Sequence, residues 1–321
     1  MVVKCKECQK EFKRQHKSRL YCSKKCKGKA AYLKTLWTNE TQGKAVVRPM
    51  KEDPLSQSIE IIKTSKRKDV VPLVRPLNAE FDIAIVITDV HIPFHSEHWL
   101  EKVLRQAYKL RLDNPNKRIA LIIGGDFLDL SMFSQFGHNN KDSDAKKSIE
   151  DGAIVLRALY KLFDYIYMCA GNHDERFMKA LNGHLGFDDL MKMLRSDIRG
   201  HIPDTHLLTT SRNFILCQDK TWAIVHPRNY SKIATTVPRK LAELHSMNVI
   251  SGHTHHPPGY ASTSNGLHVG LENGCIQDKS LVGYLKDMTL FPKHMFGFTI
   301  LLKCNDGKTR FKQISEQDMN A

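Results

Sequence analysis

Five short apolar runs, each followed directly by residues that can bind a metal ion, constrain the fold of this 321-residue chain more than any other feature. They have the length and apolar content of buried strands and lie at residues 81–88, 118–123, 165–170, 222–225 and 248–250. Between or beside them, four stretches have helical spacing: 97–111, 143–163, 187–196 and 236–247. Alternation of this kind predicts a layered α/β domain. A hairpin is expected at its end, from 296–302 and 310–314 around Asn305-Asp306-Gly307.

Oxygen and imidazole side chains stand at the end of every expected strand. In chain order they are Asp89 and His91, then Asp126 and Asp129, then Asn172, His173 and Asp174, then His226, and last His253 and His255. Open α/β sheets place their sites at the carboxyl ends of strands, so these side chains are expected to converge. The i, i+2 spacing of Asp89 and His91 can place both side chains on one face of an extended segment. Such a mixed set suits Mn, Fe, Zn or Ni better than calcium.

A second candidate metal site lies at the N-terminus, where four cysteines fall within 22 residues: Cys5, Cys8, Cys22 and Cys26. The N-terminus lacks the apolar run of a secretory signal, so a tight quartet indicates a metal site rather than a disulfide framework. Two close pairs can supply the four thiolates of a tetrahedral zinc ion. So short a segment cannot bury enough surface to fold alone, and zinc binding is expected to drive its folding.

Charge is concentrated in the same N-terminal region. Residues 1–76 carry 20 Lys and Arg against 7 Asp and Glu, a net charge of +13, whereas the other 245 residues carry +2. Such a local field favours polyanions, and nucleic acid is the expected partner. The cations expected to contact it are Lys10, Lys13, Arg14, Lys17, Arg19, Lys24 and Lys25. The alternatives are a solvated lysine-rich arm and a zinc knuckle that binds protein.

Composition divides the chain into three parts: a four-cysteine zinc-binding module at 1–37, a basic polar linker at 38–78, and the α/β domain at 79–321. Four prolines in the polar stretch indicate the linker. No run of about 18 apolar residues occurs, so no membrane partner is expected. Together with the missing secretory signal, this predicts a cytoplasmic location. The sequence leaves the oligomeric state open.

The metal-binding blocks follow a known order: Asp89-Val90-His91, Gly125-Asp126-x-x-Asp129, Gly171-Asn172-His173-Asp174, His226, and Gly252-His253-Thr254-His255. This order resembles the D-x-H, G-D-x-x-D, G-N-H-D/E, H and G-H-x-H pattern of the calcineurin-like metallophosphoesterase superfamily, across most of residues 81–302. The similarity is closest to bacteriophage phosphoesterases, through 171–176 (GNHDER) and 272–275 (ENGC). It implies an α/β/β/α sandwich with two mixed sheets, and host cytoplasm if a phage encodes the chain.

The resemblance also implies roles for individual residues. One metal ion would be held by Asp89, His91, Asp126 and His255, and a second by Asp126, Asn172, His226 and His253, with Asp126 bridging and manganese favoured. The two ions would clamp a phosphate and activate a water molecule. His173 would act as general acid or transition-state stabiliser, with Asp174 orienting it, while Asp129 could position Asp126. His226 departs from the family pattern because Pro227 follows it, which leaves His245 and His268 as alternatives.

Two further departures from the superfamily pattern indicate the class of substrate. Protein phosphatases of the superfamily usually carry Arg where Leu130 stands and Glu where Asp174 stands. The chain is therefore more similar to the phosphodiesterases and nucleases, and hydrolysis of nucleic acid is the leading hypothesis. Two alternatives stay open. One is a phosphoesterase for small nucleotides or phosphomonoesters, and the other is a nucleic-acid- or protein-binding factor with little catalysis.

Overall fold

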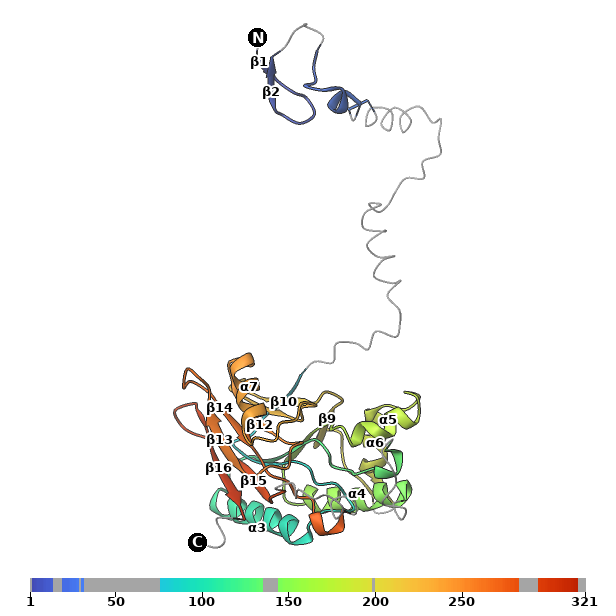
Figure 1. Cartoon of the computed structure of the whole chain (residues 1–321), viewed down its shortest axis with the longest axis vertical. Helices are drawn as coiled ribbons and strands as arrows, with labels where there is room; N and C mark the ends of the chain where they lie inside the picture. The colour runs from blue at the N-terminus through green and yellow to red at the C-terminus, as the bar shows by residue number, and fades with distance from the viewer. Residues whose placement is uncertain are drawn as a thin grey trace. The chain divides into compact units, whose positions relative to one another are not determined.

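The structure is a computed structural model that describes residues 2–13, 19–28, 30–31, 76–134, 144–197, 200–282 and 294–316. The chain divides into two compact units, residues 1–72 and 73–321 (Figure 1). Most of the predicted linker, 38–75, lies outside the described residues. Its last two residues, Leu77 and Asn78, belong to a strand, so the described part of the larger unit includes residues before the boundary expected at 79.

Two six-stranded sheets form the larger unit, and each mixes parallel and antiparallel neighbours. We call them the β4 sheet and the β12 sheet. The β4 sheet has the order β16 (Thr309–Ser315), β15 (Gly297–Lys303), β4 (Ile83–Ile87), β5 (Ile119–Gly124), β6 (Tyr165–Cys169), β9 (Leu207–Thr210). The β12 sheet has the order β13 (Gly259–Ser262), β14 (Val269–Glu272), β12 (Asn248–Ser251), β11 (Trp222–Val225), β10 (Phe214–Cys217), β3 (Leu77–Ala79).

Helices cover the outer faces of both sheets (Figure 1). The β4 sheet packs against α3 (Glu97–Asp113), α4 (Ala145–Tyr160), α5 (Asp174–Ala180) and α6 (Phe187–Arg195). The β12 sheet packs against α7 (Thr236–His245). Shorter elements are η1 (Ser131–Phe133), β7 (Ser196–Asp197), β8 (Gly200–His201) and η2 (Lys279–Leu281). The layers are therefore α/β/β/α, and the prediction of a layered α/β fold with two mixed sheets is confirmed.

The alternation of side chains along β4 explains why its sequence is apolar throughout. Ile83, Ile85 and Ile87 join the core beneath the helices, whereas Ala84 and Val86 join the core between the two sheets. Successive side chains of a strand point to opposite faces, so a strand covered on both faces has no solvent-facing position. Each large aliphatic side chain buried in this way contributes about 1.5–3 kcal/mol.

Capping residues fix where the long helices begin. The Ser96 hydroxyl accepts a hydrogen bond from the Trp99 amide at 3.4 Å, and α3 begins at the next residue. The Asp144 carboxylate accepts one from the Lys146 amide at 2.9 Å, so α4 begins two residues later than the expected 143. A side-chain acceptor at this position satisfies an amide that has no partner within the helix.

The smaller unit contains a two-stranded antiparallel ribbon, β1 (Val2–Lys4) and β2 (Glu11–Lys13), with Val3 opposite Phe12. Residues 24–28 are helical, as are residues 30 and 31. The helix therefore starts before the second cysteine of the second pair. In neither unit do the described residues include a helix of the length and apolarity needed to cross a membrane.

Candidate metal centre

Within each sheet, the ligand-bearing strands run parallel to one another. In the β4 sheet, β4, β5 and β6 are parallel, and in the β12 sheet β11 and β12 are parallel. Because parallel strands end at the same edge, the segments after these five strands come together where the two sheets meet. Three groups of donors form there, each with its ligand atoms within 4.8 Å of one another.

Asp89, His91 and His255 form the first group. The Nε2 atom of His255 lies 3.1 Å from Oδ1 of Asp89 and 3.2 Å from Nε2 of His91. All three side chains are buried. Their donor atoms point at a common space, which is the arrangement expected of ligands that could share one cation.

Asp126, His226 and His253 form another group. Nε2 of His226 lies 3.2 Å from Oδ2 of Asp126 and 3.0 Å from Oδ1 of Asn172. The predicted second set of ligands is thus brought together, Asn172 included. His226 takes this place rather than the two alternatives. His245 is exposed at the end of α7, and His268, the residue before β14, belongs to none of the donor groups.

The remaining group consists of His91, Asp126 and His173, so Asp126 lies between the two groups described above. Its Oδ2 is 3.7 Å from Nε2 of His91 on one side and 3.2 Å from Nε2 of His226 on the other. Its Oδ1 accepts a hydrogen bond from the His173 amide at 2.8 Å, which fixes the carboxylate. The position is the one that a carboxylate shared by two cations requires.

Backbone conformation marks the same residues. Asp89, His91, Asp126, His253 and His255 all have positive φ, between 50° and 76°. Residues other than glycine rarely adopt this left-handed conformation, and each instance costs about 1–2 kcal/mol. Local strain of this kind persists where the surrounding structure over-determines it and clusters at functional sites. Here it turns five donor side chains inward from the strand ends.

The electrostatics of the site favour positive charge. Burial disfavours the charged form of His91, but hydrogen bonds to Asp129 and Asp89 outweigh it and raise the pKa of His91 to about 10. Burial is also outweighed at His226, where Asp126 raises the pKa to about 9. Against the effect of burial, His255 holds the pKa of the Asp89 carboxyl well below its usual range, and His226 lowers the pKa of the Asp126 carboxyl. A divalent cation can supply this positive charge instead, because a ligating imidazole nitrogen must be unprotonated.

The partner of His173 differs from the predicted one. Its Nδ1 lies 3.1 Å from Oδ1 of Asp129 and 2.9 Å from the Asp129 carbonyl oxygen. Oδ1 of Asp129 also lies 3.0 Å from Nδ1 of His91. Arg176 completes the group, since its Nη2 is 3.0 Å from Nε2 of His173. Asp129 therefore orients two imidazoles and does not serve only to position Asp126.

Asp174, which was expected to orient His173, instead accepts hydrogen bonds from two backbone amides. Its Oδ1 accepts a hydrogen bond from the Leu128 amide at 3.1 Å, and its Oδ2 accepts one from the Gly171 amide at 2.9 Å. The carboxyl is fully buried, and burial together with nearby Asp126 raises its pKa to about 7. The assignment of Asp174 as partner of His173 is corrected: Asp174 ties the segment after β5 to the segment after β6.

Main-chain and side-chain contacts behind the ligands hold them in place. Nδ1 of His226 lies 3.0 Å from the Gly124 carbonyl oxygen, which can only accept, so Nε2 is the nitrogen left to face Asn172 and Asp126. Both oxygens of Asp89 accept from the His253 amide at 3.0 Å. Asn273, which follows β14, supports β4, because its side-chain Nδ2 donates to the Val86 carbonyl oxygen at 3.1 Å.

Gly171 is required by close approach. A Cβ at this position would overlap the carboxylate and the amide nitrogen of Asp126. We expect Gly171→Ala to lower the free energy of unfolding by about 1–3 kcal/mol through overpacking and to weaken metal binding, because Asp126 must move. Chemical denaturation and metal titration measure both effects. Gly259→Ala is the control, since the nearest atom to its added Cβ is 3.8 Å away, and equal changes in the two variants would contradict this account.

The remaining histidines near the motifs divide into several cases. His294, which no sequence motif indicated, lies with its Nδ1 3.4 Å from Nδ1 of His255, and burial lowers its pKa to about 3. His256 contacts the Ser231 carbonyl oxygen at 2.8 Å instead of joining a donor group. His95 and His98 also belong to none of the groups found among the described residues. His138 lies outside the part of the chain that the structure describes.

In the smaller unit, the sulfur atoms of Cys5, Cys8, Cys22 and Cys26 lie within 4.8 Å of one another. The separations are 3.5 Å between Cys8 and Cys22 and 3.7 Å between Cys22 and Cys26, close to the edge of a tetrahedron with Zn–S bonds of about 2.3 Å. Hydrogen bonds to the Cys8 and Cys26 thiols raise the pKa of Cys22 to about 12. Four thiols this close ionise together when a cation neutralises them, so the cluster could hold a zinc ion.

The basic residues around this cluster are not equivalent. Lys10, Lys13, Lys24 and Lys25 are exposed, while Arg14 and Lys17 lie outside the described residues. Arg19 differs, because its Nη2 donates to the Cys22 carbonyl at 3.0 Å and its guanidinium lies 5.5 Å from the centre of the Phe12 ring. Arg19 therefore stabilises the turn that carries the second cysteine pair.

Comparisons with known proteins find a distant likeness among solved structures. The chain matches no protein-family model and no curated protein sequence. Among solved structures it is similar to Vps29 of Chaetomium thermophilum, with 10% sequence identity and a TM-score of 0.32, over 73% of this chain and 96% of that chain. A similarity this low indicates nothing about a shared activity.

Proposed function

We propose that residues 73–321 form a calcineurin-like phosphoesterase that works with two divalent metal ions, as a phosphodiesterase or nuclease, with manganese favoured. One observation carries the proposal. Donors from five strand ends in two sheets meet around Asp126, whose Oδ2 faces His91 at 3.7 Å and His226 at 3.2 Å. A pair of ions held about 4 Å apart supplies charge to neutralise a phosphate and to activate water for in-line attack.

The chain's own residues supply the rest of the chemistry. His173 belongs to the group formed with His91 and Asp126, and its Nδ1 is held by Asp129, so its Nε2 is the atom able to exchange a proton with the leaving oxygen. Nη2 of Arg176, which can only donate, lies 3.0 Å from that Nε2; in the proposed reaction the guanidinium turns to the phosphate oxygens, which frees Nε2 to exchange the proton. The His173 amide and Asp126 stay hydrogen-bonded, which links the proton donor to the shared carboxylate.

Nucleic acid is the proposed substrate class. Leu130 and Asp174 stand where protein phosphatases carry Arg and Glu, and the segment 1–76 carries a net charge of +13. Phosphate neutralisation by lysines gives sequence-independent binding that weakens with salt. The four-cysteine cluster would position those lysines by holding one zinc ion. Binding at this module would raise the local concentration of a polynucleotide near the catalytic site.

A substrate panel tests this proposal with full-length protein and added manganese: single- and double-stranded DNA, RNA, bis-p-nitrophenyl phosphate and a phosphopeptide. Hydrolysis of the small diester and of at least one polynucleotide is expected. Cleavage of the small diester without any polynucleotide would reject the nuclease function and favour small nucleotides. Release of phosphate from the phosphopeptide alone would reject both.

The role of the basic module has its own prediction. Replacing Lys10, Lys13, Lys24 and Lys25 with Gln should raise KM for polynucleotide. It should also weaken the salt dependence of binding: for duplex DNA, the slope of log K against log salt concentration should fall by up to about 0.9 per lost phosphate contact. Hydrolysis of bis-p-nitrophenyl phosphate should not change. Steady-state kinetics from 50 to 300 mM salt measure both. Equal losses with the two substrates would contradict a tethering role.

A further inference from the structure

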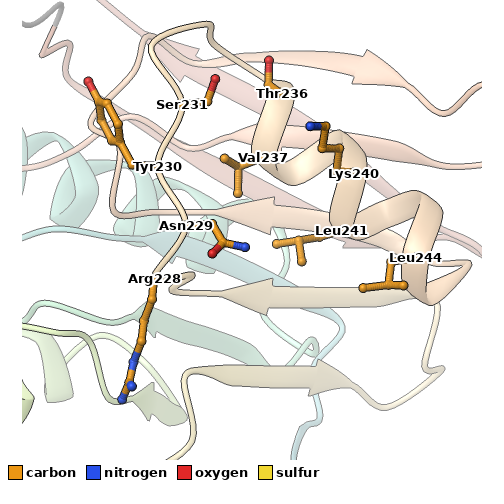
Figure 2. A pocket seen from close by; sticks show the side chains of 9 residues that line it. All are labelled: Arg228, Asn229, Tyr230, Ser231, Thr236, Val237, Lys240, Leu241 and Leu244. Atoms are coloured by element: carbon orange, nitrogen blue, oxygen red, sulfur yellow. The ribbon is translucent and has the colours of Figure 1, made fainter.

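A hollow of about 590 Å³ lies between the segment that follows β11 and helix α7. Figure 2 shows the loop facing the helix, with Val237 and Leu241 projecting from α7 toward it. The loop contributes Arg228, Asn229, Tyr230 and Ser231, and the helix contributes Thr236, Val237, Lys240, Leu241 and Leu244. The volume falls within the range of about 300–1,000 Å³ that small-molecule sites occupy. None of these side chains belongs to the donor groups of the metal centre.

The loop side of this pocket is fastened to the metal centre. It begins two residues after His226, and the Ser231 carbonyl oxygen lies 2.8 Å from Nε2 of His256, the residue that follows His255. The ring of His256 also stacks on Tyr230, with centroids 6.3 Å apart and an interplanar angle of 22°. A molecule in the pocket would thus lie beside the segments that carry two of the candidate ligands.

The pocket also has a fixed cation. Nη2 of Arg228 lies 2.8 Å from both carboxylate oxygens of Glu175, which is buried at the start of α5. Nζ of Lys179 lies 3.3 Å from the same carboxylate, so two cations share one negative charge. Of these residues only Arg228 lines the pocket, and Lys240 adds a second cation to the lining from the helix side. The lining holds these two cations and no carboxylate, and it therefore favours an anionic ligand.

The neutral part of the lining favours a flat, aromatic group. Tyr230 is 60% exposed although its ring is stacked on His256, so one face of a positioned ring is available. Val237, Leu241 and Leu244 give an apolar wall opposite the loop, and Leu244 is 74% exposed. Asn229, Ser231 and Thr236 offer hydrogen-bonding groups at its rim. Stacking on an aromatic side chain beside cations is how proteins bind nucleobases of single strands.

We propose that this pocket binds the nucleoside of the ester whose phosphate lies at the metal centre. The base stacks on Tyr230, and Arg228 and Lys240 contact phosphate oxygens next to that nucleoside. The inference rests on the proposed phosphoesterase function and adds to it the part of the substrate that gives specificity. A pocket of this composition makes a nucleotide ester a better substrate than an alkyl ester with the same leaving group.

The test compares two esters that share the p-nitrophenolate leaving group: thymidine 5′-(p-nitrophenyl phosphate) and methyl p-nitrophenyl phosphate. We expect full-length protein with manganese to prefer the nucleoside ester in kcat/KM. Tyr230→Ala should reduce the ratio of the two kcat/KM values by about tenfold, the loss expected for one stacked base. Tyr230→Phe should keep the ratio, as should Tyr260→Ala, which removes a tyrosine of nearly equal exposure (61%) on β13. An unchanged ratio in Tyr230→Ala overturns the inference and leaves the phosphoesterase function intact.

A binding measurement separates this inference from the proposed function. Isothermal titration of full-length protein with thymidine 5′-monophosphate does not require turnover. If neither ester is hydrolysed but the nucleotide binds, and binds about tenfold more weakly to Tyr230→Ala, the pocket stands while the proposed function fails. Equal affinity for wild type and Tyr230→Ala, or absence of binding to both, overturns the pocket. Because Tyr230 is mostly exposed, we expect the Tyr230→Ala variant to unfold at the same temperature as the wild type, and thermal unfolding of the same samples measures this.

Discussion

Asp126→Asn should lower the metal content of the full-length chain from three ions to one and reduce diester hydrolysis by at least about 10³-fold. Asparagine keeps the shape of the side chain and the acceptor for the His173 amide, which donates to Oδ1 at 2.8 Å. It removes the negative charge that faces His91 and His226. Both candidate metal ions depend on that charge, and both are expected to be lost together. Elemental analysis and steady-state kinetics measure the two effects.

Two variants serve as controls for this prediction. Cys22→Ser should remove only the ion of the smaller unit, leaving two, because it breaks the four-sulfur cluster. Asp188→Asn changes an exposed carboxylate in the first turn of α6 and should leave three ions and full activity. If Asp126→Asn retained three ions, or lost only one of the two, the shared position of Asp126 would be wrong.

His173→Gln is expected to reduce kcat by about 10²–10⁴-fold, the usual contribution of a general acid, while the metal content stays at three. The His173 side chain is 13% exposed and its Nδ1 contacts Asp129, so the imidazole is positioned without being needed to complete the donor groups of Asp89 and His226. The loss should be greatest with an alkyl leaving group, which needs a proton. It should be smaller with p-nitrophenolate, which leaves readily without one.

Asp129→Asn tests the same assignment from the other side. This variant should lower kcat by part of the loss expected for His173→Gln, and again more with the alkyl leaving group, because it disturbs the orientation of His173. Asp174→Asn should instead lower the free energy of unfolding, since its carboxyl holds the Leu128 and Gly171 amides. Equal loss with both leaving groups, accompanied by release of metal, would show that His173 is structural.

The two-sheet architecture explains why so many donors can meet at one place. Asp89, Asp126 and Asn172 follow strands of the β4 sheet, whereas His226 and His253 follow strands of the β12 sheet. The sheets pack face to face through apolar side chains that alternate with those facing the helices. Register within each sheet and packing between the sheets therefore set the distance between donor groups.

The sequence predicted both the strands that carry the ligands and the types of the ligand residues. The interior strands are covered on both faces, so they are apolar throughout, and the change to Asp, His or Asn at their ends is abrupt. Strands β3, β9, β10, β13 and β14 were not predicted. They are three or four residues long, and their pairing depends on distant partners, as where Leu77 lies opposite Ile215. Nothing local in such a segment distinguishes it from a loop.

The order of the ligands along the chain and the four-cysteine spacing came from the sequence alone, because strand ends and short loops are local properties. The partner of His173 was decided only by the tertiary structure. His173 and Asp174 are consecutive where α5 begins, and neighbouring residues on a helix point in different directions. Asp129 reaches His173 because β5 and β6 pair side by side. In the same way, His294 meets His255, and Tyr230 meets His256, only through the folding of distant segments.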